Sequence, residues 1–579
     1  MYYGAVMSWA RRLFLGICCA SVVLAAGCTS SPQRASDSRD GSISTSSGTA
    51  SRVLRLASRE EPKDNFGIAS ASGAAAGEFG FIFSAGLTVY DHDGLLQPRL
   101  AQKVPRVEDG DWQIFPDGTM EVTWRLRPDA VWHDGTPLTA ADYELSARLL
   151  LDRDIPRLGA DGWASSSIAG ATAIDRQTLV IRWKQAYLFA NMAQPSTFPP
   201  VPQHLVGDLY QTDKQLFINS PYWTTEYVGV GPYRLVEWVQ GSHISGEAFD
   251  RYVLGRPKAS RITIQLIPDP NAQLANVLAG EIDVLPPGNI RVLELRTLKD
   301  AWDPVGGGTA MSVVQGLRQL LPQFRDPNAA WARDPRIREA FVHMLDRQTM
   351  ADVLQLGFTV PADSFLSPRD PTWRLADQRG FPHHTFDLAQ AQRLMGDAGW
   401  TRGSDGLYRD ARGQLLALQV RGGSDFQQEI TVVAAQFKDA GLESNPDIIP
   451  DTTADQRELQ NTFPGVLATS GGGTTSFQDF DEFNIGTAEN RWQGRNRGAY
   501  RNPLMERLTK EWASNSFEES KRLSVQADIV KLIADEVVSI PLYYNPRGQA
   551  WTKLVRGPGP YENPFQSILT WNIHEWEVG

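Results

Sequence analysis

The chain has 579 residues and a formal net charge of -11, with 42% hydrophobic and 21% charged residues. An acidic, well-mixed surface argues against binding to nucleic acid and against electrostatic docking on anionic lipid. Cysteine occurs only at Cys18, Cys19 and Cys28, so the chain beyond Cys28 forms neither disulfides nor cysteine metal sites. That part is too long for one hydrophobic core and predicts two to four domains.

The first 28 residues have the three parts of an export signal. Arg11 and Arg12 are basic, the stretch 13–26 is apolar and uncharged, and small residues precede Cys28. At roughly 15 residues the apolar run is short for a membrane-spanning helix, which needs about 20. We therefore predict a lipoprotein signal peptide over 1–28, with diacylglycerol attached to Cys28.

The segment 29–51 is rich in Ser and Thr and contains almost nothing apolar. Such a stretch buries too little surface to offset the entropy of ordering it. It predicts a disordered linker that holds a body from about Arg52 to Gly579 off the membrane. Removal of the leader takes away two arginines and no acid, which changes the formal charge from -11 to -13. The true start, Met1 or Met7, stays open.

The body then alternates strand and helix patterns. Met120, Val122 and Trp124 are separated by polar residues, and this period of two predicts a half-buried strand. Thr139 followed by Asp142 at the third place resembles a capping box, so we expect a helix to begin there.

Two further helix starts follow in the second half of the chain. Asp334 with Pro335 predicts an N-cap and a first helical residue, and apolar residues repeat after them at spacings of three and four. Asp387 predicts another N-cap, and that helix is expected to end near Gly399. Mixed strands and helices of this kind predict α/β lobes.

A series of segments carries sequence patterns in a fixed order along the body. WHDGTPLTAAD stands at 132–142, GVGPY at 229–233, LAGEID at 278–283 and IPLYY at 540–544. Further segments of the series are 87–90, 98–101, 124–128, 334–347 and 387–400. Together these segments resemble the extracytoplasmic solute-binding proteins of ABC importers, in the oligopeptide- and dipeptide-binding branch, family 5.

The resemblance implies an α/β architecture of the periplasmic-binding-protein type II fold, bilobal, hinge-bending and with an additional inserted domain that makes three lobes. Hinge crossings are expected near 306–315 and 541–548. Such hinges let lobes close over a solute, so that binding energy becomes a change of shape. The implied bounds are 52–83, 206–309 and 541–579 for lobe I, 84–205 for lobe II, and 310–540 for lobe III.

The implied function is that of a lipid-anchored extracytoplasmic receptor, expected to be a monomer, on the periplasmic side or outer surface of the cell membrane. It would deliver its ligand to ABC permease subunits that work with cytoplasmic ATPase subunits. We expect no enzyme activity and no cofactor, because the sequence has no G-x-S-x-G, H-E-x-x-H or P-loop motif. No metal site is predicted, since sequence neighbours such as His383 and His384 seldom chelate together.

The ligand class is the open point. In peptide-binding members of the family, an aspartate in a "W..DY.dP" segment of lobe III pairs with the amino terminus of the peptide, because a buried ammonium needs a partner. The corresponding stretch, 467–480, has three glycines and hydroxyls instead of the tryptophan and aspartate, and Asp479 or Asp481 would have to substitute. An oligopeptide is the first prediction. An oligosaccharide or other polar solute, and a regulatory or scaffold role without transport, remain alternatives.

The candidate ligand contacts are selected by residue type. Consecutive glycines allow a close backbone approach, aromatic rings stack, and an arginine clamps a carboxylate. For the glycines a plain loop is the alternative, and for each aromatic residue ordinary core packing. The predicted ligand-binding residues are Trp163, Met311, Ser470, Gly471, Gly472, Gly473, Thr474, Phe477, Asp479, Arg491 and Trp492.

Overall fold

The computed structural model describes residues 53–62, 74–152, 154–155, 167–450, 456–492, 494–514, 518–559 and 568–579. The predicted signal peptide, the predicted linker and Trp163 lie outside these residues. Within the described ranges, no helix has the length and hydropathy that a membrane crossing requires.

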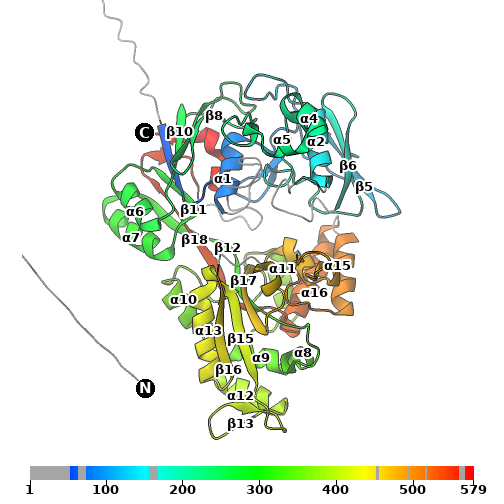
Figure 1. The fold of residues 1–579 in the computed structure, drawn as a ribbon, viewed down its shortest axis with the longest axis vertical. Helices are drawn as coiled ribbons and strands as arrows, with labels where there is room; N and C mark the ends of the chain where they lie inside the picture. Colours follow the sequence, from blue (N-terminus) through cyan, green and yellow to red (C-terminus); the bar gives the residue numbers. More distant parts are fainter. Residues whose placement is uncertain are drawn as a thin grey trace, which may run out of the picture. The chain divides into compact units, whose positions relative to one another are not determined.

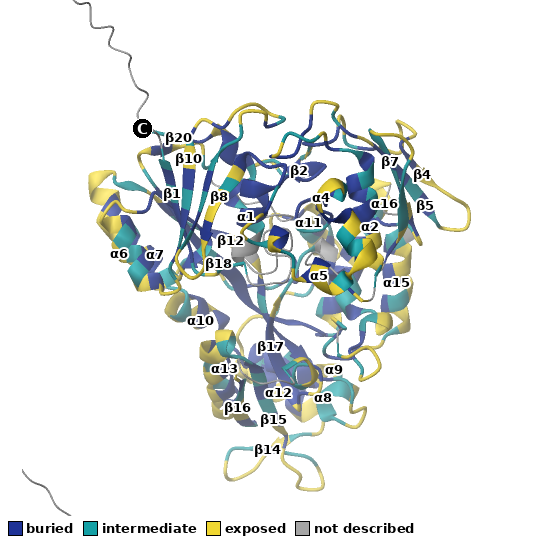
Figure 2. Ribbon diagram, turned by 45° about the horizontal axis from the view of Figure 1, so that its top comes forward, coloured by how far each residue is buried: buried dark blue, intermediate teal, exposed yellow. Residues whose placement is uncertain are grey.

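Two long strands form the centre of the largest sheet. Its ten described strands follow the order β16-β15-β17-β12-β18-β11-β1-β10-β9-β8. β12 (Gly308–Pro322) and β18 (Ile540–Thr552) pair antiparallel along most of their lengths. Figure 1 shows them between the elements around β1 and those around β15, and β18 is almost entirely buried (Figure 2). The predicted hinge crossings overlap these two strands, while the hinges and the lobe boundaries remain predictions.

The β1 group of strands lies on one side of this central pair. In it β1 is parallel to β10 and β11, and β8 and β9 form a hairpin. Leu54, Leu56, Ile262 and Ile264 are buried in its core. The group consists of β1 (Val53–Ser58), β8 (Tyr233–Val239), β9 (His243–Ala248), β10 (Arg261–Leu266) and β11 (Val284–Ile290), with α1 (Ala74–Phe83), α6 (Pro270–Leu278) and α7 (Val292–Trp302).

The β15 group lies on the other side. β15 (Ala417–Gly423) is parallel to both β16 (Glu443–Ile449) and β17 (Gly465–Gly471), and α13 (Gln427–Asp439) is the crossover from β15 to β16. Parallel pairing brings the carboxyl ends of β15 and β17 to the same edge of the sheet. The 3-10 turn η4 (Ser424–Phe426) and the start of α13 follow β15 at that edge.

A separate four-stranded sheet contains the strand that the alternating pattern predicted. Its order is β4-β5-β7-β6, and in β5 (Met120–Arg125) the side chains of Met120, Val122 and Trp124 are buried. The helix predicted after it is α2 (Ala140–Leu151), where the Asp142 carboxylate accepts the backbone N–H of Thr139 at 2.8 Å. Both predictions are confirmed. The other strands are β4 (Trp112–Ile114), β6 (Ile168–Ala173) and β7 (Thr178–Trp183).

The other two predicted helix starts are also confirmed. α9 (Pro335–His343) begins after Asp334, whose carboxylate accepts the N–H of Arg336 at 3.0 Å. α12 (Leu388–Asp397) begins after Asp387, which accepts the N–H of Gln390 at 2.9 Å. Gly399 lies just past its end with φ of 84°, the left-handed conformation expected of a helix stop.

The remaining elements connect these sheets or cover them. They are β2 (Thr88–Tyr90), β3 (Leu96–Pro98), α4 (Gln203–Thr212), α5 (Lys214–Ile218), η2 (Pro221–Trp223), η3 (Asp303–Val305), α8 (Ala330–Arg333), α10 (Arg347–Leu354), α11 (Pro371–Gln378), β13 (Thr401–Arg402), β14 (Tyr408–Arg409), α14 (Gln456–Leu459), η5 (Thr474–Phe480), η6 (Glu482–Asn484), α15 (Pro503–Ser514), α16 (Glu519–Asp535), β19 (Val555–Arg556), η7 (Leu569–Glu575) and β20 (Glu577–Val578).

A buried carboxylate ties the C-terminal segment to α1. Glu78 accepts the backbone N–H groups of Leu569 and Thr570 at 3.0 and 2.9 Å, and the Thr570 hydroxyl at 2.6 Å. Burial raises the pKa of Glu78 to about 7, although these hydrogen bonds act in the opposite direction. An ionisable group of the first helix thus lies inside the core that η7 completes.

We expect Glu78 to make folding pH-dependent. Because its pKa is higher in the folded chain than its ordinary value, the unfolded chain loses the proton first as the pH rises through 4.5. The stability advantage of wild type over Glu78→Gln should therefore fall by up to about 3 kcal/mol between pH 4.5 and 7 and then level off. Urea unfolding at several pH values measures this. Glu108 is exposed, so Glu108→Gln should show the same pH dependence of the free energy of unfolding as wild type. If the pH dependence of Glu78→Gln is also the same as that of wild type, Glu78 does not have this role.

Candidate functional site

A polar pocket of about 180 Å³ lies at the carboxyl ends of β15 and β17. This edge of a parallel sheet is where α/β proteins commonly bind ligands, because the connecting loops leave a crevice there. The lining combines a guanidinium, a carboxylate, amides, hydroxyls and one aromatic ring. The lining residues are Gly423, Ser424, Asp425, Phe426, Gln456, Gln460, Leu467, Ala468, Thr469 and Arg497.

Arg497 supplies the positive charge of the pocket. Its Nη1 donates to the Thr469 hydroxyl at 3.1 Å. Burial lowers the pKa of Arg497, the Asp479 carboxylate acts in the opposite direction, and Arg495 lowers it further. A guanidinium has five N–H donors, so one bond to a neutral hydroxyl leaves donors for a ligand.

Arg318 connects the pocket to the central strands. Its guanidinium carbon lies 4.2 Å from the centre of the Phe426 ring, which lines the pocket. Its Nε donates to Asn545 Oδ1 on β18 at 3.2 Å and lies 3.7 Å from Glu429 Oε1 on α13. The aromatic wall of the pocket is therefore held against β12 by a cation–π contact.

The adjoining face of β18 carries polar groups without internal partners. Burial lowers the pKa of Arg547, Arg318 lowers it further, and Asp425 and Glu60 act in the opposite direction. Among the described residues, Arg547 Nε and both amide atoms of the fully buried Gln549 have no hydrogen-bond partner. Buried polar groups are normally paired, so this strand face is suited to a polar solute or to water.

Charges from both sides of the central pair meet here. Glu60 follows β1, whereas Asp425 follows β15, and both act on Arg547 of β18. The lining of the pocket itself comes from the ends of β15 and β17 and from Gln456, Gln460 and Arg497.

Gly472 and Gly473 have backbone conformations in the left-handed region that favours glycine. Their φ angles are 92° and 98°. The close approach, however, is to the chain itself: the N–H of Gly473 donates to the carbonyl oxygen of Phe365 at 3.4 Å. A Cβ on Gly472 would lie 2.9 Å from that oxygen. The described contacts of these two glycines are those of a packed loop.

The other predicted contacts lie in several environments. Ser470 and Gly471 end β17 next to Thr469 of the pocket, opposite Arg318 and Leu317 of β12. Met311 lies on β12, partly buried against the core of the β1 group. The backbone of Thr474 begins η5.

Phe477, Asp479, Arg491 and Trp492 lie on the segment that follows. Phe477 is fully buried, with its ring 5.8 Å from that of Trp512. Asp479 pairs with Arg495 at 2.9 Å. Arg491 and Trp492 form a turn with φ of 55° and 58°. Ligand contacts by these four residues, which are not among the residues lining the pocket, remain predictions.

Sequence reasoning missed Asp425 and Phe426 and did not select Arg497 from its basic cluster. One signal was present: Gly-Gly-Ser-Asp at 422–425 follows a strand pattern and precedes a helix. Such a turn places side chains at the carboxyl edge of a sheet. Nothing local distinguishes Arg497 from Arg491 and Arg495.

The sheet order and the pocket at the strand ends define an α/β protein with a polar crevice. Residues 96–490 match the model described as "Bacterial extracellular solute-binding proteins, family 5 Middle". The chain belongs to this family. A family of binding proteins outside the cytoplasm fits the predictions of a non-enzyme and of an extracytoplasmic location.

Relatives agree with this assignment. The oligopeptide-binding protein AppA of Bacillus subtilis is 22% identical over 471 residues, which cover 79% of this chain and 81% of AppA. Protein XP55 of Streptomyces lividans is 30% identical over 363 residues, 62% of this chain and 60% of XP55.

Two solved structures show the fold. The oligopeptide-binding protein of Thermus thermophilus, complexed with a pentapeptide, aligns with a TM-score of 0.70 at 19% identity over 91% of this chain and 96% of its own. NikA of Brucella suis, complexed with Fe(III)-EDTA, aligns with a TM-score of 0.71 at 20% identity over 91% of this chain and 100% of NikA. The predicted α/β, type II bilobal fold is confirmed.

The glycine loop offers a test of packing. A Cβ at residue 472 would lie too close to the backbone oxygen of Phe365. The backbone there also has a positive φ, which alanine disfavours. Gly472→Ala should therefore lower the free energy of unfolding by about 2 kcal/mol. Gly396→Ala is the matched control, because Gly396 lies within α12 with no atom within 4 Å of an added Cβ. That variant should gain about 0.5–1 kcal/mol. Equal urea midpoints for the two variants would refute the assigned contact.

Proposed function

We propose that this protein is the lipid-anchored receptor of an ABC importer and that its ligand is an oligopeptide held at the pocket of β15 and β17. The supporting observation is the presence of both charges in one pocket, Arg497 and Asp425. A peptide is zwitterionic, so its carboxylate pairs with the guanidinium and its ammonium with an acid. The relatives named for oligopeptides add support.

Capture would be followed by closure about β12 and β18. Their pairing shifts register between Val314 and Leu317, and Gly316 in that interval has φ of 76°. Such an irregularity is a place where the sheet can bend. The solute would then bridge the β1 group and the β15 group and stabilise the closed form, which an ABC permease recognises.

A neutral polar solute such as an oligosaccharide is the second candidate. Gln456, Gln460, Ser424 and Thr469 give the pocket amides and hydroxyls, and Phe426 gives it an aromatic ring. Such groups hydrogen-bond and stack on sugar rings without any need for ligand charge. The charge of Arg497 separates the two candidates.

Arg497→Gln should weaken peptide binding at least tenfold, because a charge-assisted hydrogen bond is removed. Protein purified without refolding is first analysed by native mass spectrometry to identify the retained solute, and calorimetry with that solute then compares the variants. Arg412→Gln removes an equal charge at an exposed position and should leave the affinity unchanged. A retained series of hexose-spaced masses, or equal peptide affinity in both variants, would overturn the peptide assignment.

The membrane anchor is tested separately at Cys28. Cys28→Ser should move the protein from the membrane fraction to the soluble extracytoplasmic fraction, because the lipidated thiol is lost and the linker has no other apolar anchor. Cys19→Ser, inside the apolar run, should stay with the membrane. Fractionation with immunoblotting and labelling with a fatty acid measure both effects. Incorporation of the labelled fatty acid into Cys28→Ser would refute lipidation at this residue.

A further inference from the structure

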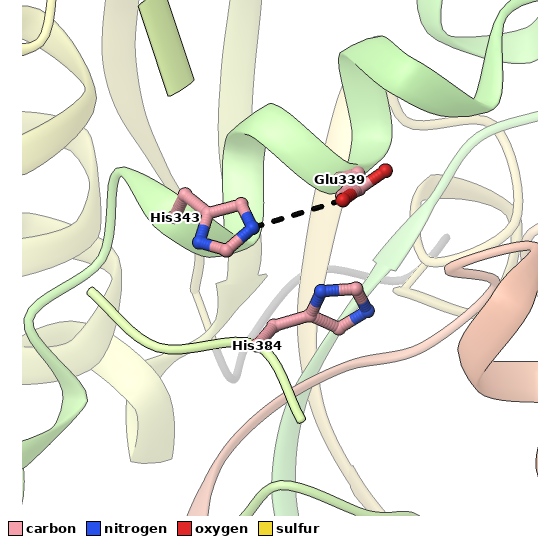
Figure 3. Close-up of side chains that lie close together, drawn as sticks. All are labelled: Glu339, His343 and His384. Carbon is pink, nitrogen blue, oxygen red and sulfur yellow. Dashed lines mark ion pairs between the residues drawn. The ribbon is translucent and has the colours of Figure 1, made fainter. Parts of the chain in front are cut away.

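Three side chains that are distant in sequence lie together beside α9. Glu339 and His343 occupy one face of that helix, four residues apart, and His384 comes from the segment between α11 and α12. One ligand atom from each lies within 4.8 Å of the other two. Figure 3 shows the imidazole of His384 below the pair that Glu339 and His343 form.

His343 is held in the tautomer that binds metals. Its Nδ1–H donates to the carbonyl oxygen of Thr385 at 2.5 Å, which directs Nε2 toward Glu339. Nε2 lies 3.8 Å from Glu339 Oε1. A histidine that donates one ring N–H to a backbone carbonyl and offers the other nitrogen is the usual arrangement at metal centres.

His384 is also in a ligand-competent state. Within the described part of the chain, its Nε2 is buried without a hydrogen-bond partner. One of its ring nitrogens lies within 4.8 Å of a ligand atom of Glu339 and of a ligand atom of His343. An imidazole nitrogen in that position can coordinate an ion that the other two ligands also reach.

The surrounding charge permits a cation. Arg347 is the nearby positive group, and its guanidinium is engaged by the carbonyl oxygens of Ala362, Pro541 and His384. Asp535 acts electrostatically on His384, and His343 acts on Asp387. With Glu339 as a direct ligand, the acids around the cluster offset Arg347.

We propose that Glu339, His343 and His384 bind one divalent transition-metal ion, with Zn²⁺ as the representative, and that water completes four-coordination. Two imidazoles and a carboxylate suit such ions. Tetrahedral Zn²⁺ with bonds of about 2.0–2.1 Å requires ligand atoms roughly 3.3 Å apart, so small side-chain rotations close the site. Glu339 is about a third exposed, at 34%, which gives the ion a route of entry.

The ion would tie α9 to the segment that leads into α12. None of the three ligands lines the pocket at β15 and β17, so the site is independent of the proposed solute. It also differs from the expectation drawn from the sequence, which considered His384 only beside His383. His383 is instead occupied by two acids, Asp363 at 2.8 Å and Asp377 at 2.7 Å.

The test uses the mature chain without a histidine tag, treated with EDTA, dialysed and titrated with zinc sulfate by calorimetry. We expect one ion per chain and a higher melting temperature with zinc. Glu339→Gln and His384→Asn should each weaken zinc binding at least tenfold. His383→Asn is the matched control and should bind zinc as wild type does.

Cobalt substitution gives a second readout, since tetrahedral Co²⁺ bound by these ligands should absorb visible light and the variants should lose that absorption. Melting curves without metal establish that each variant is folded. Because Glu339 is partly exposed, Glu339→Gln provides the test by itself if His384→Asn does not fold. Absence of stoichiometric zinc binding in wild type, or zinc affinity that is unchanged in folded Glu339→Gln, would overturn the site.

Discussion

The backbone pairing of β12 with β18 is the constraint on which the rest of the structure depends. These strands are bonded to each other along most of their lengths, and each is bonded on its outer side over part of its length, β12 to β17 and β18 to β11. Through them the β1 group and the β15 group share one sheet although they come from separate stretches of the chain. The same strands carry Arg318 and Arg547, which places charge where the two groups meet.

Among the described residues, Arg497 and Arg547 beside the pocket have no acid in a close ion pair, and this has an energetic consequence. Burial already lowers the pKa of Arg497 and Arg547, because a charged group leaves water at a cost. An anionic group of a solute would supply the missing partner and recover part of that cost. Under the proposed function, the pocket would therefore be more favourable when filled, which is the property that a capture protein requires.

Much of the local structure could be predicted from sequence alone. Helix starts at Thr139, Asp334 and Asp387 depend on a side chain bonding to backbone only two or three residues away, and β5 depends on alternation within six residues. These interactions are short-range, so the order of residues specifies them. The ordered series of segments identified the family for the same reason, since each segment builds a local turn, cap or strand of one scaffold.

The sequence by itself determined the caps, the alternating strand and the family, because each is set by a residue and its immediate neighbours. Only the tertiary structure decided that Gly472 and Gly473 take a positive φ beside Phe365, that Arg497 rather than Arg491 lines the pocket, and that His384 lies with His343. These outcomes depend on which distant strands pair and which helices pack. Local spacing carries no record of such contacts, because their partners are brought together only when the whole sheet forms.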